Sequence, residues 1–202
     1  MSRPASGANA RERTPRDQLL AAAVDYAARE GIAGASLRQV AAALGTSHRM
    51  LIYHFGSKAG LLAAVVGEVE RRQREALAEL RVDPGMTPEE IARRMWRRFT
   101  DPELLPLERL FFELYARALQ GREDTGDFLR TVMEPWLEQL TELHRAWGAP
   151  RATARAQARL GIAVVRGLLL DLLATGDRRG VDAAMTLFID GSARMRDDAA
   201  RG

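Results

Sequence analysis

The sequence of 202 residues contains no cysteine. Disulfides, thiolate zinc sites and cysteine nucleophiles are therefore excluded. Aromatic residues make up only 6% of the chain, and its single lysine, Lys58, stands against a large excess of arginine. The longest apolar stretch, at 160–174, is interrupted by Arg166 and Asp171 and should not span a bilayer. Because the N-terminus also lacks the apolar run of a secretion signal, we expect a cytoplasmic protein.

Helix-forming residues dominate what is present. Ala, Leu, Arg, Glu and Met are abundant, and no segment alternates apolar and polar residues as a half-buried strand would. Caps, first-position prolines and terminal glycines recur along the chain and divide it into helices. We predict an all-α fold of about nine helices, near residues 15–30, 37–44, 48–55, 58–81, 88–100, 101–120, 127–147, 150–174 and 178–195.

Charge is distributed unevenly. Residues 1–60 hold 8 basic and 4 acidic side chains, whereas the whole chain has a net charge of only +3. The excess positive charge therefore lies in the first third, which indicates a polyanionic partner for that part of the molecule. Residues 1–13 show no periodicity and are expected to form a disordered arm. Its arginines, Arg3, Arg11 and Arg13, are either a minor-groove arm or part of a plain tail.

Two short predicted helices at 37–44 and 48–55 are separated by Gly45-Thr46-Ser47. Glycine suits a left-handed turn, and Ser47 can cap the second helix, so the pair is a candidate helix–turn–helix. A purely structural helical hairpin would show the same pattern. In the helix–turn–helix interpretation, the second helix turns donors and apolar groups toward a DNA major groove, namely His48, Arg49, Met50, Ile52, Tyr53 and His54.

The segment Tyr53-His54-Phe55-Gly56-Ser57-Lys58 resembles the TetR family of bacterial transcriptional regulators. The resemblance extends over residues 14–62 and includes Arg16-Asp17, Ala22-Ala23, Glu30-Gly31, Ser36-Leu37, Val40-Ala41 and Leu44-Gly45-Thr46-Ser47. It implies an N-terminal helix–turn–helix DNA-binding domain at 14–62 and a helical ligand-binding and dimerisation domain at 63–202. Arg49 stands where the family often has glycine, and Ile52 where it often has an aromatic residue, which leaves the operator sequence open.

The DNA contacts are expected on the second helix and at two helix N-termini. Ser36 and Lys58 lie where free N–H groups and the helix dipole favour a phosphate. Phe55 is assigned to the core. The full set of expected DNA-binding residues is Ser36, Thr46, Ser47, His48, Arg49, Met50, Ile52, Tyr53, His54 and Lys58.

Large aromatic and methionine side chains gather in the predicted helices between 88 and 147. They either pack as a solid core or line an apolar cavity. The resemblance favours a cavity for a small apolar or aromatic effector. The candidate ligand-binding residues are Trp96, Phe99, Phe111, Tyr115, Met133, Trp136 and Leu140.

The last two predicted helices carry more apolar surface than one monomer should cover. Pairing them about a two-fold axis would give a four-helix bundle between two subunits. The residues predicted to form this homodimer interface are Val164, Leu168, Leu172, Val181, Met185 and Phe188.

Signals for catalysis are weak. His48, His54 and His144 lack the spacing of metal ligands, the serines lie at helix caps, and no phosphate-binding glycine loop is present. We expect no metal, no cofactor and no catalytic residue. The interpretation is a dimeric, ligand-responsive DNA-binding regulator, most simply a repressor of a palindromic operator. The alternative is a helical-bundle enzyme or binding protein acting on a small apolar molecule.

Overall fold

The structure, a computed structural model, describes the backbone of residues 14–81, 85–121 and 128–201, and within these ranges every regular element is a helix. The all-α prediction is therefore confirmed. The predicted arm at 1–13, with its three arginines, lies outside the described residues. The helices are α1 (Pro15–Glu30), α2 (Leu37–Ala43), α3 (His48–Phe55), α4 (Lys58–Arg81), α5 (Pro88–Phe99), α6 (Leu105–Leu119), α7 (Phe128–Ala146), α8 (Arg151–Thr175) and α9 (Arg178–Arg201).

Three helices begin at the capping boxes that their sequences predict. In each, the cap hydroxyl accepts the N–H of the third helical residue, whose side chain accepts the N–H of the cap in return. The pairs are Thr14 with Asp17 in α1, Ser36 with Gln39 in α2, and Thr87 with Glu90 in α5.

Two boundaries differ clearly from the sequence prediction. Helix α6 begins at Leu105 instead of 101, because Asp101 closes a turn first: its carboxylate accepts the N–H of Glu103 and its carbonyl accepts the N–H of Leu104. Helix α9 continues to Arg201, beyond the predicted end at 195.

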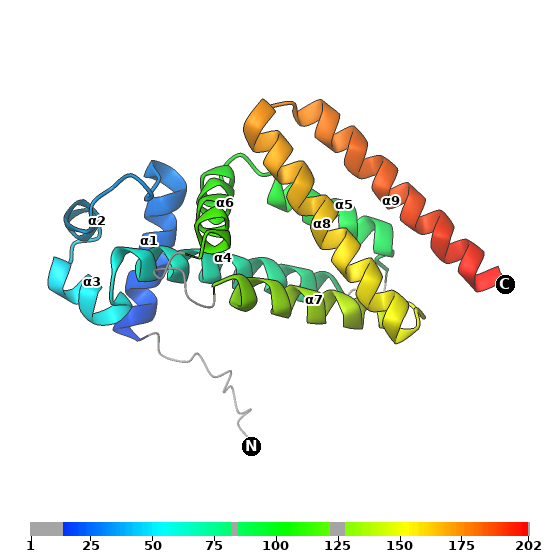
Figure 1. The fold of residues 1–202 in the computed structure, drawn as a ribbon, viewed down its shortest axis with the longest axis horizontal. Helices are drawn as coiled ribbons and strands as arrows, with labels where there is room; N and C mark the ends of the chain where they lie inside the picture. The colour runs from blue at the N-terminus through cyan, green and yellow to red at the C-terminus, as the bar shows by residue number, and fades with distance from the viewer. Residues whose placement is uncertain (1–13, 82–84, 122–127, 202) are drawn as a thin grey trace, which may run out of the picture.

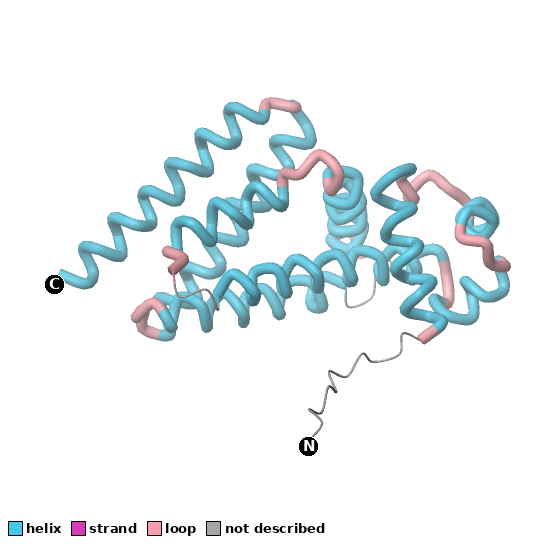
Figure 2. Tube along the Cα trace, turned by 180° about the vertical axis from the view of Figure 1, so that it is seen from behind, coloured by secondary structure: helices cyan, strands magenta, loops and turns pink. Residues whose placement is uncertain are grey.

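Helix α4 joins the two ends of the molecule. Helices α1, α2 and α3 pack around its N-terminal part, and α7 runs beside its length (Figures 1 and 2). Helix α6 stands between the three N-terminal helices and the rest, while α8 and α9 form an antiparallel pair at the far end (Figure 1). The predicted domain boundary at 62/63 therefore falls inside a continuous helix.

One apolar cluster crosses that boundary. It joins Ala23 of α1 and Leu51 of α3 to Val65 of α4 and to Leu110 and Phe111 of α6. Ala23, Leu51 and Val65 are each at most 1% exposed. Because the N-terminal helices share this core with α6, a displacement of α6 or α4 must be transmitted to them.

Three of the six predicted dimer-interface residues belong to the core of the single chain. Leu172, Val181 and Met185 are at most 6% exposed within the single chain, where they pack with Trp96 of α5. Val164, Leu168 and Phe188 are partly buried against the same cluster. Leu172, Val181 and Met185 therefore cannot supply the surface of a subunit contact and are corrected, while a contact through Val164, Leu168 and Phe188 stays a prediction.

No single helix among the described residues is long and apolar enough to cross a membrane. Within the same residues, α3 and α4 would together have the length and composition of a membrane span, but they meet at a bend of 65°.

Candidate nucleic-acid interface and ligand cavity

Helix α3 is fixed by its own cap and by two buried anchors. Ser47 Oγ accepts the N–H of Met50 at 3.1 Å, and Gly45 before it adopts a φ of 65°, in the left-handed region that glycine permits. Leu51 is 1% exposed and Phe55 is 9% exposed, so one face of the helix is held in the core. Phe55 is in the core as predicted.

The opposite face of α3 is open to solvent. Tyr53 is 78% exposed, and Met50 and Ile52 are 39% and 38% exposed. His48 and Arg49 are exposed as well. An exposed row of large apolar groups beside basic ones is uncommon on a surface with no partner, and it suits the mixed donors, acceptors and methyl groups of a major groove.

His54 does not belong to this exposed row. Its Nε2 is buried and has no hydrogen-bond partner, and its ring packs edge-to-face on Tyr53 with centroids 4.9 Å apart. Its carbonyl oxygen accepts the Nε–H of Arg16 at 3.4 Å, and the Arg16 guanidinium lies 5.2 Å from the Phe55 ring centroid. The Nε2 atom is therefore not available to DNA in this arrangement, while a DNA contact by His54 stays a prediction.

The two residues predicted to bind phosphate, Ser36 and Lys58, differ in how far their polar groups are free to contact DNA. Ser36 is exposed at the start of α2, where its hydroxyl is engaged in the capping box with Gln39. Lys58 is half-buried, and its Nζ donates to the carbonyl of Ala33 at 2.6 Å. This bond ties the start of α4 to the loop before α2. It uses one of the three ammonium donors and leaves two for a phosphate.

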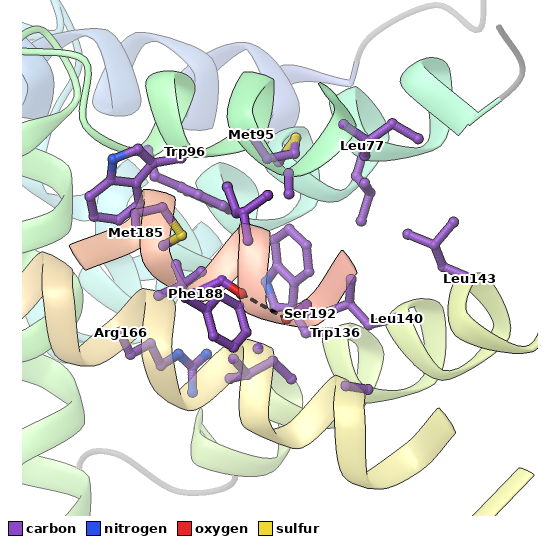
Figure 3. A pocket seen from close by; sticks show the side chains of 18 of the residues that line it. Leu77, Met95, Trp96, Trp136, Leu140, Leu143, Arg166, Met185, Phe188 and Ser192 are labelled. Carbon is purple, nitrogen blue, oxygen red and sulfur yellow. Dashed lines mark hydrogen bonds between the residues drawn. The ribbon is translucent and has the colours of Figure 1, made fainter. Parts of the chain in front are cut away.

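A cavity of about 180 Å³ lies among α4 to α9. One water requires only about 10–15 Å³ on this measure, so the space suits a small organic molecule. The sequence left open whether this region is hollow or solid. Five of the seven predicted ligand-binding residues line the cavity, several of them drawn in Figure 3: Trp96, Phe99, Phe111, Trp136 and Leu140.

Tyr115 and Met133 do not line the cavity and are corrected. Both flank Arg166, which does line it. The Arg166 guanidinium lies 5.6 Å from the Tyr115 ring centroid and 4.9 Å from that of Phe111, and it also contacts the sulfur of Met133. Their role is to hold this arginine at the cavity wall.

Two carboxylates line the cavity, and the sequence analysis missed both. Glu70 of α4 is 9% exposed and accepts the indole N–H of Trp136, and Glu108 of α6 is 6% exposed. Burial, reinforced by the charge of Glu70, raises the pKa of Glu108 to about 8. Burial likewise raises the pKa of Glu70 and lowers that of Arg166.

Their sequence signal is a charge within an apolar face. Glu70 lies one helical turn from Val66 and adjoins Val69, and Glu108 stands between Leu107 and Leu110. A carboxylate in such a position either points to solvent or is buried at a functional site. Among the described residues, no group of three or more His, Cys, Asp or Glu could hold a metal ion.

Polar contacts close the cavity on the side of α5 and α9. The indole N–H of Trp96 donates to Asp182 at 2.7 Å, and Arg93 pairs with Asp190 at 2.8 Å. Arg178 donates to the carbonyl of Thr100 at 2.8 Å. These contacts fix α9 across α5, so the aromatic wall formed by α5 has a defined position.

The N-terminal helices and the hollow body behind them define the class of the molecule, a two-part helix–turn–helix protein built only from helices in its described residues. Residues 19–65 match the family model described as "Bacterial regulatory proteins, tetR family". This N-terminal part of the chain is therefore a TetR-family DNA-binding domain.

Known proteins agree with this assignment. The HTH-type transcriptional repressor NicS of Pseudomonas putida is 30% identical over 130 residues, a match that spans 61% of this chain and 61% of the relative. A TetR transcriptional regulator from Legionella pneumophila has the same fold, with a TM-score of 0.69 at 19% identity over 90% of this chain and 98% of that one. These relatives are regulators and not enzymes.

A third similarity concerns a protein with a bound ligand. The multidrug binding protein EbrR, in its complex with proflavin, superimposes with a TM-score of 0.59 at 28% identity. The match covers 87% of this chain and 97% of EbrR.

Proposed function

We propose that this protein is a transcriptional regulator that binds a palindromic DNA operator as a homodimer and leaves it when a small molecule fills the cavity. The observation that carries the proposal is the pairing of an exposed α3 with a cavity that shares two helices, α4 and α6, with the core of the N-terminal domain. NicS, a named repressor, and EbrR, a named multidrug binding protein, support the two halves of the proposal.

The cavity is connected to α3 through short paths. Helix α4 carries Glu70 and Leu77 at the cavity, and its N-terminal half packs on α1 and α3. Helix α6 carries Glu108 and Phe111 at the cavity and also packs on α1. A ligand that binds better when these helices are displaced would therefore change the separation of the two α3 helices in a dimer. Differential affinity for the two arrangements is the requirement for release.

The subunit contact is proposed on the outward face of α8 and α9. Leu160 and Leu170 of α8 are 49% and 52% exposed, and Leu187 of α9 is 75% exposed. Between the two α8 leucines, Ala163 and Gly167 are also exposed, which gives the three- and four-residue spacing of one helix face. This exposed stripe, which adjoins Val164 and Leu168 on α8, is the surface that a second copy would bury.

Gly167 supports that assignment. Glycine within a helix costs about 1 kcal/mol relative to alanine. A Cβ added at Gly167 would meet no atom within 4 Å, so packing within the chain does not require glycine there. Close approach of a helix from a second subunit would require it.

The direct test of the proposed function is capture of DNA. Random-sequence duplexes selected on the purified protein should yield an inverted repeat whose half-sites are centred about one helical turn, roughly 34–36 Å, apart or a multiple of it. Selection that yields no common sequence would contradict the proposal.

Arg49→Ala should relax the base preference at one position of each half-site. Arg49 is exposed on α3 and suits a bidentate bond to guanine. The expected loss is about 1–3 kcal/mol for the preferred base and little for the others. Affinities for operators changed at single positions provide the measurement. An equal loss for every operator would place Arg49 on the DNA backbone instead.

Lys58→Ala should weaken binding to all duplexes alike. If the two remaining ammonium donors reach a phosphate, the slope of log affinity against log salt should become shallower by about one unit. The bond from Lys58 to the Ala33 carbonyl is also lost. Circular dichroism of the variant separates a local loosening of the helix–turn–helix from the loss of a phosphate contact. An unchanged salt slope would restrict Lys58 to its structural bond.

A further inference from the structure

We propose, on the basis of the effector role proposed above, that the cavity selects an aromatic organic cation whose positive group lies against Glu70 and Glu108. The effector predicted from the sequence alone was apolar or aromatic. The two carboxylates at the cavity wall add a requirement for positive charge.

The burial of the carboxylates is the first ground. Glu70 and Glu108 are 9% and 6% exposed and come from different helices, yet both line the same cavity. Glu70 has one hydrogen-bond donor, the indole of Trp136, and no donor to Glu108 is found among the described residues. Burying a carboxyl group without a partner is costly and is retained where a ligand provides the partner.

The partly buried guanidinium of Arg166 does not offset both carboxyl groups. Arg166 lies over the rings of Phe111 and Tyr115 and is hydrogen-bonded to Tyr115, and it balances at most one of the two carboxylates. An anionic ligand would have to compete with both glutamates for this arginine. A cationic ligand would instead stabilise the ionised form of the second carboxyl group, which the one arginine does not balance.

Aromatic rings form much of the remaining wall. Trp96, Phe99, Phe112 and Trp136 line the cavity, and the Phe99 and Trp136 rings have centroids 5.9 Å apart. The faces of such rings attract organic cations, most strongly where water is excluded. The same rings contribute apolar surface to the flat, uncharged part of the molecule.

The other ionisable groups at the cavity do not add net positive charge. Burial lowers the pKa of His144, so its imidazole is neutral at neutral pH. Arg196 lines the cavity together with Glu89, to which it is ion-paired. Arg74 of α4 acts on Glu70 only through a distant charge interaction.

Proton release is the signature of this site. In the empty cavity Glu108 is largely protonated at pH 7, since its pKa is raised to about 8. A bound cation favours the ionised carboxylate, so binding should expel a proton into solution. A neutral ligand of the same shape should expel none.

The test compares the binding of three bicyclic aromatic probes of similar size to the full-length protein. They are 1-methylquinolinium, which is permanently cationic, the isosteric neutral 1-methylnaphthalene, and the anion 1-naphthoate. Titration calorimetry in two buffers of different ionisation enthalpy gives both the affinity and the protons released. Quenching of the fluorescence of Trp96, Trp136 and Trp147, which all line the cavity, reports occupancy independently.

At pH 8 the cation should bind roughly tenfold or more tighter than 1-methylnaphthalene. Its affinity should rise with pH from 6 to 8 by up to about tenfold per unit, with release of up to one proton. Glu108→Gln should remove the pH dependence and most of the preference for the cation, while leaving the affinity for 1-methylnaphthalene within about twofold. Glu113→Gln, an exposed position on the same helix, is the matched control and should behave as the parent.

Three results would overturn the proposal. They are tighter binding of 1-naphthoate than of the cation, equal affinity for the cation and the neutral probe, and no binding of the cation at 1 mM. Operator binding is measured on the same preparations without a probe. Protein that binds DNA but does not prefer the cation refutes the charge selectivity alone. Protein that binds the cation with proton release but binds no DNA supports the selectivity and refutes the regulator.

Discussion

Leu187→Asp is expected to convert the protein into monomers that no longer hold a palindromic operator. Leu187 is the most exposed large apolar side chain of α9, at 75%. If it lies at the two-fold axis or near it, each dimer would receive two unpaired charges in a dehydrated contact. A large apolar side chain buried there contributes about 1.5–3 kcal/mol, and the substitution replaces that gain with a desolvation cost. Sedimentation at micromolar concentration measures the change.

Leu119→Asp is the matched control for this experiment. Leu119 ends α6 and is 66% exposed, but it is not on the α8–α9 face. It should leave both the dimer and the fold intact. Leu168→Glu provides a further contrast, because Leu168 packs against the apolar cluster around Trp96. Its replacement should unfold the protomer instead of separating two folded protomers. A Leu187→Asp protein that stays dimeric would move the contact to another surface.

The pattern of α8 explains why the sequence did not separate its buried apolar residues from its exposed ones. Val164, Leu168 and Leu172 recur every four residues, and apolar or small residues such as Leu160 and Gly167 lie beside them on the helix surface. Periodicity identifies a helix that is apolar all round, but it cannot tell which face meets the protomer's own core. Only the position of α5, whose Trp96 packs against Leu172, decides between them.

The helix–turn–helix was more predictable because its signals are local. Caps at Ser36 and Ser47 and the glycine turn at Gly45 fix α2 and α3 through bonds between residues close in sequence. The burial of His54 was not predictable in this way, because it depends on packing within the folded N-terminal helices.

The cavity was predictable as a cluster of aromatic residues but not in its charge. Glu70 and Glu108 are 38 positions apart, and nothing in the spacing shows that both line one space. Tyr115 and Met133 have the residue types expected of a cavity wall, yet the side chain of Arg166 lies between them and the space. Contacts that link α4, α6 and α8 decide these positions, and they arise only when the chain is folded.

Glu108→Gln is expected to stabilise the protein, and by more at higher pH. In the unfolded chain Glu108 has its ordinary pKa of 4.5, whereas in the folded protein its pKa is about 8. The folded state therefore binds more protons than the unfolded state between these values, and its stability falls as the pH rises through that window. At pH 7 the cost is about 3 kcal/mol, so the variant should melt roughly 6–12 °C higher than the parent.

The difference in melting temperature should shrink as the pH falls toward 4.5, where Glu108 is protonated in the folded parent and about half protonated in the unfolded parent, so that little of the penalty remains. Glutamine keeps the size of the side chain and removes only its ionisation. Glu113→Gln, on the solvent face of α6, should shift the melting temperature by no more than about 2 °C at any pH, because an exposed ion pair contributes little. Melting curves recorded every half unit from pH 4.5 to 8.5 test this directly. Parallel curves for Glu108→Gln and the parent would mean that Glu108 ionises at its ordinary pKa in the folded protein and reaches water through the cavity.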